Sequence, residues 1–541
     1  MNDSEKSPRV VSLGDRCCGC GACAARCPKS CISMEPDDCG FLHPTVDASG
    51  CVGCGACDAV CPALNAPGED GCEFALWAKA HDVGLLDRSS SGGVFGLLAG
   101  DALSRGGVVA GAAWTDGCRE LRHVLVEDRP ALGAVMRSKY VQSAVGRGVF
   151  EGVRAALREG RPALFAGTAC QVAGMRSYLG KLADSDPFLG VDVICHGVPS
   201  PELWSRWVDY RGEAFGSDVC DVNMRSKTTG WLSYSAMYKH IAEKDNTGDT
   251  ESQIFGKDWY MKAFLANASL RSSCLACPAK RSSGADITLG DFWGFQNTHP
   301  EVDNSKGVSA VLCNTEKGVR AFEAISGLTA NGPATLDGVI AGNPSLVHSV
   351  TPYPKRDEFL NDVSAGLSIP DLMDKWDFRP TLWQRVRGKL GGIKRRLKRL
   401  VGRRAKMAKD RYLQALRGLA ISAVVLIHCL PQCAASVAIR PFLNFSVALF
   451  LFLSGVLTDE RKFNAGGGLR RRISKVAGPY AFWSVIYLAA FPALHGRLGF
   501  WRSPWAPYRL RCTIYWSIHS LCCLLRYCSG SFHGIGSLSI V

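Results

Sequence analysis

A cysteine pattern that occurs twice within the first 62 residues constrains this chain more than any other feature. The first run is Cys17-x2-Cys20-x2-Cys23-x3-Cys27-Pro28, and the second run is Cys51-x2-Cys54-x2-Cys57-x3-Cys61-Pro62. A [4Fe–4S] cube needs four converging thiolates, and the tight loop of one run supplies only three of them. In two-cluster ferredoxins, the fourth cysteine of each run ligates the other cluster. We therefore expect one cluster on Cys17, Cys20, Cys23 and Cys61, and a second cluster on Cys51, Cys54, Cys57 and Cys27.

Zinc and disulfide bonds are the alternatives to iron and sulfur. Zinc is held by two C-x2-C pairs and has no use for a third cysteine at the same spacing followed by Cys-Pro. Disulfides would indicate an exported domain, whereas Met1–Val11 is polar and charged and lacks the apolar segment of a signal peptide. We therefore expect the N-terminal part in a reducing cytoplasm, with Cys18, Cys31 and Cys39 as spare thiols.

An α/β region is expected after a linker at Ala66–Gly71. Its start is predicted as a strand at Phe74–Lys79, a helix at Val94–Ser104 and a buried strand at Val108–Trp114. The loop Ser89–Gly93 precedes the helix, where unpaired backbone N–H groups and the helix dipole favour phosphate. An ordinary capped turn is the alternative interpretation of this loop.

Two further strand–turn–helix units, predicted at Ala163–Leu179 and from Leu189 onward, each place a cysteine where the strand ends, and a C-x2-C pair follows later in the chain. The four candidate thiolates are Cys170, Cys195, Cys274 and Cys277. Sites in open α/β sheets collect at such strand ends, so a third iron–sulfur cluster is one interpretation. The other is that the two strand-end cysteines are buried small residues and that the C-x2-C is a redox or zinc pair.

Several short motifs together resemble the coenzyme F420 hydrogenase/dehydrogenase beta-subunit family, over about residues 72–375. The motifs are Ser89–Gly93, Ser138–Ser143, Gly167–Gln171, Cys195–Gly197, Gly230-Trp231 and Gly290–Gly294. The resemblance implies an iron–sulfur flavoprotein, in which FAD passes electrons between cubane clusters and an organic substrate, with a deazaflavin in some members. One departure is Ala169, which stands where the family's turn usually has proline.

The resemblance, together with the chemistry of the serine and glycine loop, predicts contacts to a flavin cofactor. The candidate cofactor contacts are Ser91, Gly92, Gly93 and Lys139. Lys227 and His196 are further polar candidates near the flavin, and for each lysine or histidine a surface charge or a structural hydrogen bond is the alternative. The resemblance leaves the substrate open, and coenzyme F420 is one candidate among several.

The charge of the chain is concentrated between Arg385 and Arg411, where thirteen lysines and arginines stand against Asp410 alone. A nucleic-acid-binding arm could look like this, but apolar segments follow at once, and basic residues before a span mark its cytoplasmic side. The predicted spans are each close to the roughly 20 apolar residues that cross a bilayer. They are Leu413–Leu430, Pro441–Leu457 and Val476–Leu494.

Arg417 and His428 lie eleven residues apart in the first predicted span, so a helix would place both on one face. This spacing, with Asn444–Gly455 and Arg470–Ile473, resembles the acyltransferase-3 family of membrane O-acyltransferases. The resemblance implies that His428 is the general base for the acceptor hydroxyl and that Arg417 serves the acyl donor. The family carries about ten spans, so we interpret the membrane part as truncated and the tail Trp501–Val541 as a shifted reading frame.

The sequence therefore predicts an α+β protein built from a dicluster ferredoxin domain, a mixed α/β flavoprotein domain and a C-terminal all-α transmembrane segment. The predicted boundaries are 1–66 for the ferredoxin domain, 67–380 for the flavin domain, 381–411 for a basic linker, 412–500 for the partial acyltransferase and 501–541 for the tail. The expected function is a flavin-dependent iron–sulfur oxidoreductase tethered to the membrane. The alternatives are a membrane O-acyltransferase acting on sugars or cell-surface polysaccharide, and an electron carrier without a substrate site. The expected partners are a redox protein or small molecule and membrane lipid, with no nucleic acid.

Overall fold

The computed structural model describes residues 7–241 and 249–378, together with Leu419 and Ser422. The chain divides into two compact units, 1–379 and 380–541. Apart from Leu419 and Ser422, the predicted membrane spans, and with them Arg417 and His428, lie outside the described residues. None of the helices that the structure describes combines the length and apolar character needed to cross a membrane.

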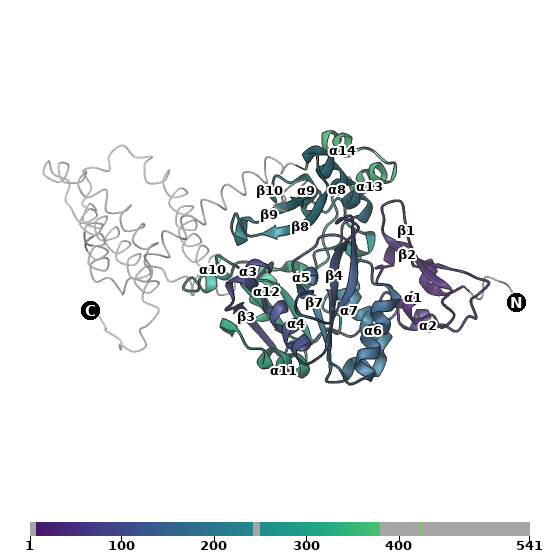
Figure 1. Ribbon diagram of the computed structural model, residues 1–541, viewed down its shortest axis with the longest axis horizontal. Helices are drawn as coiled ribbons and strands as arrows, with labels where there is room; N and C mark the ends of the chain where they lie inside the picture. The colour runs from purple at the N-terminus through teal and green to yellow at the C-terminus, as the bar shows by residue number, and fades with distance from the viewer. Residues whose placement is uncertain (1–6, 242–248, 379–418, 420–421, 423–541) are drawn as a thin grey trace, which may run out of the picture. The chain divides into compact units, whose positions relative to one another are not determined.

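An eight-stranded mixed sheet forms the centre of the first unit, residues 1–379 (Figure 1). Its strands are β3 (Phe74–Ala80), β4 (Val108–Thr115), β5 (Glu120–Val126), β6 (Ala163–Thr168), β7 (Phe188–Val193), β11 (Ile287–Asp291), β12 (Ser309–Cys313) and β13 (Leu328–Pro333). They lie in the order β13-β3-β12-β11-β7-β6-β4-β5. The four inner strands β4, β6, β7 and β11 are parallel, and antiparallel strands extend the sheet on both sides. The mixed α/β core predicted from the sequence is thus confirmed.

Helices cover both faces of this sheet. They are α3 (Val83–Asp87), α4 (Val94–Ser104), α5 (Leu132–Val135), α6 (Arg147–Arg158), α7 (Ala169–Leu179), α10 (Phe295–Thr298), α11 (Glu316–Ala324) and α12 (Leu336–Gly342). Successive strand residues point to opposite faces, so Val109 and Leu164 pack with α4 and α11, whereas Val108 and Phe165 pack with α6 and α7. The alternation buries two apolar layers against one sheet.

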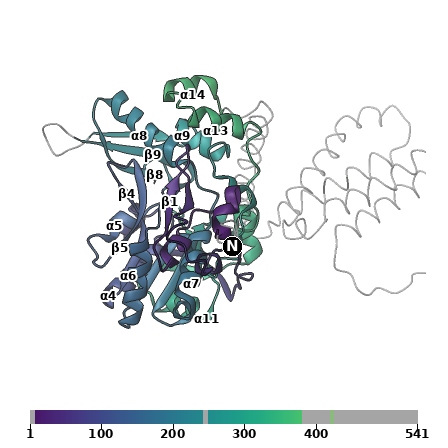
Figure 2. The ribbon, with the colours of Figure 1, turned by 90° about the vertical axis from the view of Figure 1, so that its right-hand side faces the viewer.

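A smaller layer lies beside the large sheet and is built around three antiparallel strands. The strands are β8 (Val219–Ser226), β9 (Ser235–His240) and β10 (Thr250–Ile254), and the helices are α8 (Pro201–Phe215), α9 (Trp259–Leu265), α13 (Arg356–Ser364) and α14 (Ile369–Lys375). Figure 2 shows these helices gathered near β8 and β9. Their shared core is rich in large aromatic side chains such as Trp204, Trp207 and Trp259.

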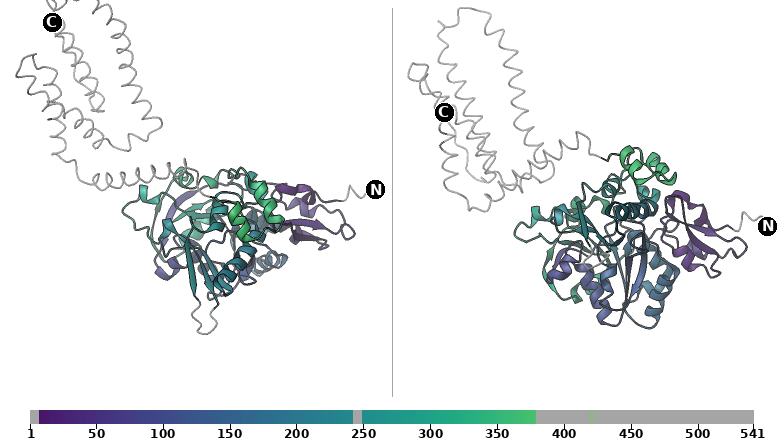
Figure 3. Two further views of the ribbon diagram at one scale, coloured as in Figure 1. Left: turned by 90° about the horizontal axis from the view of Figure 1, so that it is seen from above. Right: turned by 45° about the horizontal axis from the view of Figure 1, so that its top comes forward.

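The N-terminal segment, residues 7–66, lies at one end of the unit against α6 and α7 (Figure 3). It contains a 3-10 helix (Arg9–Arg16), α1 (Ala22–Arg26), β1 (Ile32–Pro36), β2 (Leu42–Val46) and α2 (Ala56–Ala59). The strands β1 and β2 form an antiparallel pair between the two cysteine runs. Cys20, Ala22 and Ala25 join the same apolar cluster as Phe150 of α6 and Val172 of α7.

Most sequence-predicted elements around the strand ends are confirmed. The helix predicted at Val94–Ser104 has those bounds in the structure. Helix α7 begins with the capping box formed by Thr168 and Gln171, and α8 begins at Pro201 after Ser200, whose hydroxyl accepts the Leu203 N–H. Such caps satisfy N–H groups that the first helical turn leaves unpaired.

Candidate functional site

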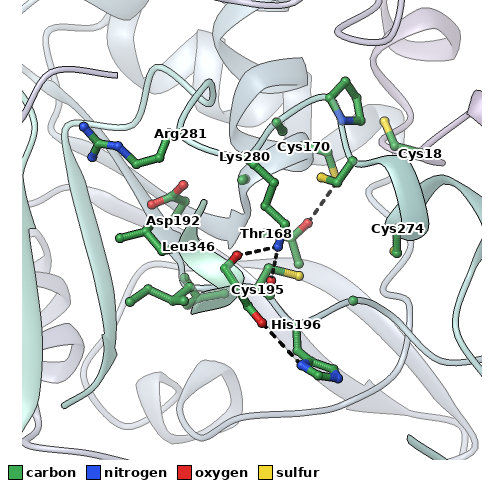
Figure 4. A pocket seen from close by; sticks show the side chains of 18 of the residues that line it. Cys18, Thr168, Cys170, Asp192, Cys195, His196, Cys274, Lys280, Arg281 and Leu346 are labelled. Atoms are coloured by element: carbon green, nitrogen blue, oxygen red, sulfur yellow. Dashed lines mark hydrogen bonds between the residues drawn. The ribbon is translucent and has the colours of Figure 1, made fainter. Parts of the chain in front are cut away.

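A cavity opens where β6 and β7 end, and four cysteines line it together with Cys18. The strands are parallel neighbours with Thr168 opposite Val193, so Cys170 and Cys195 emerge at the same edge. The C-x2-C pair Cys274 and Cys277 reaches this edge from a 3-10 turn, Ser272–Ala276. Figure 4 shows Cys18, Cys170, Cys195 and Cys274 around one space, with Asp192 and Arg281 on its other side. The structure therefore brings together the four thiols that the sequence singled out as a third site.

Backbone bonds hold the C-x2-C turn against the loop that carries Cys195. The Arg271 N–H donates to the Val198 carbonyl at 2.9 Å, and the Val198 N–H points at the Cys274 sulfur at 3.5 Å. The Lys280 ammonium donates to the Cys195 and Ser345 carbonyls at 2.6 and 2.5 Å. The Lys280 side chain thus lines the thiol cavity next to Cys195.

The thiols of this site are partly buried and close enough to repel one another when charged. Burial raises the pKa of Cys274 to about 12, with neighbouring Cys170 and Cys277 adding to the rise. Burial also raises the pKa of Cys195, again with contributions from Cys274 and Cys170. Iron would supply the positive charge that such a thiolate set needs. Four partly buried sulfurs with a nearby lysine are therefore a donor set that fits a cubane cluster.

The N-terminal runs provide a second cavity, which is lined by all four cysteines assigned to the first cluster. These are Cys17, Cys20, Cys23 and, from the second run, Cys61. Burial raises the pKa of Cys23 to about 12, with Cys17 and Cys61 as the next causes. The exchange of the fourth cysteine between runs therefore fits the geometry.

Among the cysteines assigned to the second cluster, Cys27 and Cys57 are buried, whereas Cys51 and Cys54 lie nearer the surface. Cys54 is exposed, and the Cys27 sulfur lies 3.4 Å from that of Cys31. A hydrogen bond with Cys27 and burial raise the pKa of Cys31 to about 11, and Cys51 contributes to this rise. The sequence led us to expect Cys31 as a spare thiol, but it lies among these cysteines, as Cys18 does at the other two sites.

No group of three or more histidine, cysteine or acidic side chains in the described ranges is arranged to hold a single metal ion. The thiolates that hold a cubane cluster lie farther apart than the ligands of a single metal ion, because each of the four binds a different iron atom. The ligand assignments from the sequence therefore stay predictions, and those for the first and third sites are supported by the cavities that their cysteines line.

The serine and glycine loop proposed for cofactor binding is held by internal hydrogen bonds. The Ser91 hydroxyl donates to the Val308 carbonyl at 2.8 Å, and the Gly92 N–H donates to the Ser309 hydroxyl at 3.0 Å. Gly93 caps α4 with a φ of 85°, a conformation that favours glycine. Any cofactor contact of this loop would therefore have to come from groups other than the Ser91 hydroxyl and the Gly92 N–H.

The two lysines predicted near the flavin are buried and bonded to carbonyls. The Lys139 ammonium donates to Met136 at 2.6 Å, and Lys227 donates to Leu86 and Ser91, both at 2.8 Å. Burial lowers the pKa of each lysine to about 7. His196 instead lines the thiol cavity, with its Nε2 2.6 Å from the Asn267 side-chain oxygen. The cofactor roles of these residues stay predictions.

A buried arginine that was not predicted from the sequence lies among aromatic rings. Arg225 is 3% exposed, its guanidinium lies 4.0 Å from the centre of the Tyr234 ring, and it pairs with Asp291 at 2.9 Å. Trp231 stacks on Trp293 with ring centres 5.4 Å apart. Both tryptophans belong to motifs quoted above, but nothing local marks Arg225, because its partners are distant in sequence.

Comparisons with known proteins agree with both resemblances. Residues 161–330 match the family model for the C terminus of the beta subunit of coenzyme F420 hydrogenase/dehydrogenase. Residues 410–525 match the model "Acyltransferase domain", and this match ends inside the tail that we interpret as a shifted reading frame. Both resemblances predicted from the sequence are therefore confirmed over the matched residues, 161–330 and 410–525.

Among solved structures, one chain of the "F420-reducing [NiFe] hydrogenase complex from Methanosarcina barkeri" is similar to this chain. The two are 18% identical with a TM-score of 0.35, and the match covers 54% of this chain and 93% of that one. No curated protein matches the chain.

Proposed function

We propose, from the match of residues 161–330 to the F420 hydrogenase/dehydrogenase beta-subunit model, that the described unit is an iron–sulfur flavoprotein oxidoreductase. The observation that carries the proposal is the convergence of Cys170, Cys195, Cys274 and Cys277 on one cavity. These cysteines come from three separate parts of the chain, and structural packing alone gives no reason for four thiols to meet there. The iron–sulfur clusters would carry electrons one at a time, and the flavin would exchange them as a pair with the substrate.

The chain's own residues would hold the first-run and third-site cofactors next to each other, because Cys18 lines both cavities. The cysteines of the first run are buried, and the second run exposes Cys54 at the surface. Buried cysteines exclude water from the inner sites, and the exposed run is where a redox partner could approach. The direction of flow and the organic substrate, coenzyme F420 among the candidates, are left open by this arrangement.

Cofactor analysis of the anaerobically purified protein tests the proposal. We expect about eight irons for the two runs and about twelve with the third site, plus one flavin released on denaturation. Cys277→Ala should remove about four irons, whereas Cys313→Ala, which removes a buried thiol outside the cavity, should remove none. An iron content of about four or less would contradict the dicluster assignment, and absence of flavin would favour a simple electron carrier.

A second candidate function rests on the match of residues 410–525 to the acyltransferase model. We propose that this part anchors the oxidoreductase at the membrane but transfers no acyl group, because three spans cannot enclose both a donor tunnel and an acceptor site. The protein should then sediment with membranes and resist extraction by high salt. Acyl transfer that disappears in His428→Ala would overturn this proposal and would show that a partner chain completes the site.

A further inference from the structure

Arg271 joins the N-terminal segment to the third thiol site. Its side chain is 2% exposed and donates to the Cys17 carbonyl at 2.7 Å and to the Leu42 carbonyl at 2.9 Å. Its own carbonyl accepts the Cys274 N–H at 3.0 Å. One residue therefore holds the backbone of a first-run cysteine on one side and the backbone of a third-site cysteine on the other.

The contact between the two sites is unusually close around this side chain. Gln142 accepts a hydrogen bond from Arg271 at 3.3 Å and donates to the Cys18 carbonyl at 3.4 Å. Gly19 makes this approach feasible, because a Cβ there would overlap the Gln142 amide and lie 3.3 Å from the guanidinium. The two thiol cavities are neighbours, because Cys18 lines both.

The charge of Arg271 is buried without a carboxylate among its hydrogen-bond partners. Those partners are the Cys17 and Leu42 carbonyls, the Gln142 side-chain oxygen and the His43 ring. Buried charges are ordinarily paired, because an unpaired ion loses its hydration without compensation. The Asp37 carboxylate pairs with the same His43 ring at 3.3 Å, which leaves the guanidinium itself for the thiolates of the two sites to balance.

Hydrogen bonds place Arg271 between the two sites. On one side the guanidinium donates to the Cys17 carbonyl and to Gln142, which in turn donates to the Cys18 carbonyl. On the other side the Arg271 carbonyl accepts the Cys274 N–H. The same residue therefore lies against cysteines of both sites.

We propose that Arg271 is a positioning residue that holds the first cluster against the third, and that its buried charge raises the reduction potentials of both. This inference rests on the proposed function. Reduction adds a negative charge to a cluster, and a nearby cation in a poorly hydrated environment stabilises the reduced state more than the oxidised one. Arg271 thereby keeps the two inner clusters easier to reduce than they would be without it.

The test compares Arg271→Gln and Arg271→Lys with Arg356→Gln in the full-length, cluster-loaded protein. Arg356 is the matched control, because it is also buried and holds the same loop through the Leu270 carbonyl at 2.7 Å and the Ser272 hydroxyl at 3.0 Å, but on the side of Asp357. Two quantities are measured. One is the iron content, and the other is the midpoint potential of each cluster, which is determined by electron paramagnetic resonance during a redox titration.

Arg271→Gln should shift the potentials of the first and third clusters to more negative values and leave that of the exposed second cluster unchanged. Arg271→Lys should shift these potentials less than Arg271→Gln does, because it keeps the positive charge. It should nevertheless broaden the resonance signals of the clusters, because lysine lacks the planar guanidinium that binds two carbonyls. Arg356→Gln should leave all three potentials in place. Arg271→Lys also serves as the readout if the glutamine variant fails to fold.

Unchanged potentials in a fully loaded Arg271→Gln protein would overturn the inference, as would an equal shift in Arg356→Gln. Failure of the proposed function gives a different result, because wild-type protein would then lack the iron and the resonance signal of the third cluster before any substitution is made.

Discussion

The two cysteine runs share one sequence pattern and occupy different surroundings. Gly19 and Gly53 stand at the same position of each run and have φ values of 65° and 66°. A Cβ at Gly19 would collide with Gln142 and lie 3.0 Å from the Leu42 carbonyl, whereas a Cβ at Gly53 would have no neighbour within 4 Å. The local backbone thus follows from the motif, and the packing around it does not.

The same contrast holds for the cysteines themselves. Cys17, Cys20 and Cys23 are all buried. In the second run Cys57 is also buried, but Cys54 is exposed, and Val52, next to Cys51, is 60% exposed. The first run is packed on α6 and α7, where Arg147 donates to the Ala24 carbonyl at 2.5 Å and to the Cys27 carbonyl at 3.2 Å. This difference suits an inner relay and an outer contact point for a partner, in the function proposed above.

Loss of a ligand from each run should give the largest effect. Cys20→Ser and Cys54→Ser should each lower the iron content by about four per chain. Only Cys20→Ser should also lower the midpoint of thermal unfolding of the whole unit, because Cys20 belongs to the apolar cluster shared with α6 and α7. Iron analysis and thermal scans under anaerobic conditions measure both effects. Equal changes of the unfolding midpoint in the two variants would remove the distinction between the runs.

The glycine pair offers a matched test of packing. Gly53→Ala should cost about 1–2 kcal/mol in free energy of unfolding, because alanine disfavours the left-handed conformation. Gly19→Ala bears the same backbone cost and should lose about 1–3 kcal/mol more from overpacking. Urea unfolding of the two variants, compared with wild type, gives both values. A smaller loss for Gly19→Ala than for Gly53→Ala would show that the N-terminal segment does not pack as described.

Chemical labelling should show the smallest but most direct difference. In protein stripped of iron, an alkylating reagent should modify Cys54 before Cys17 or Cys20, because access limits the reaction of buried thiols until the structure opens. Mass spectrometry of timed samples follows the order of labelling. Simultaneous labelling of both runs would indicate that the N-terminal segment opens as one piece.

The sequence by itself determined the local helices and strands and the positions of the cysteines at the strand ends. The strand and helix around Ser89–Gly93 and the caps at Thr168 and Ser200 follow from periodicity and from residue types that satisfy helix ends. The convergence of Cys170 and Cys195 was also predictable, because neighbouring parallel strands present their carboxyl ends at one edge.

Only the tertiary structure decided which surroundings each motif received. Nothing in the two runs predicts that Cys54 is exposed while Cys20 is buried, and nothing near Cys18 marks it as a neighbour of Cys170 and the other cysteines of the third site. Arg271 meets Cys17 across 254 positions of sequence. Such contacts depend on how distant elements pack against each other, and local patterns carry no information about a partner that lies elsewhere in the chain.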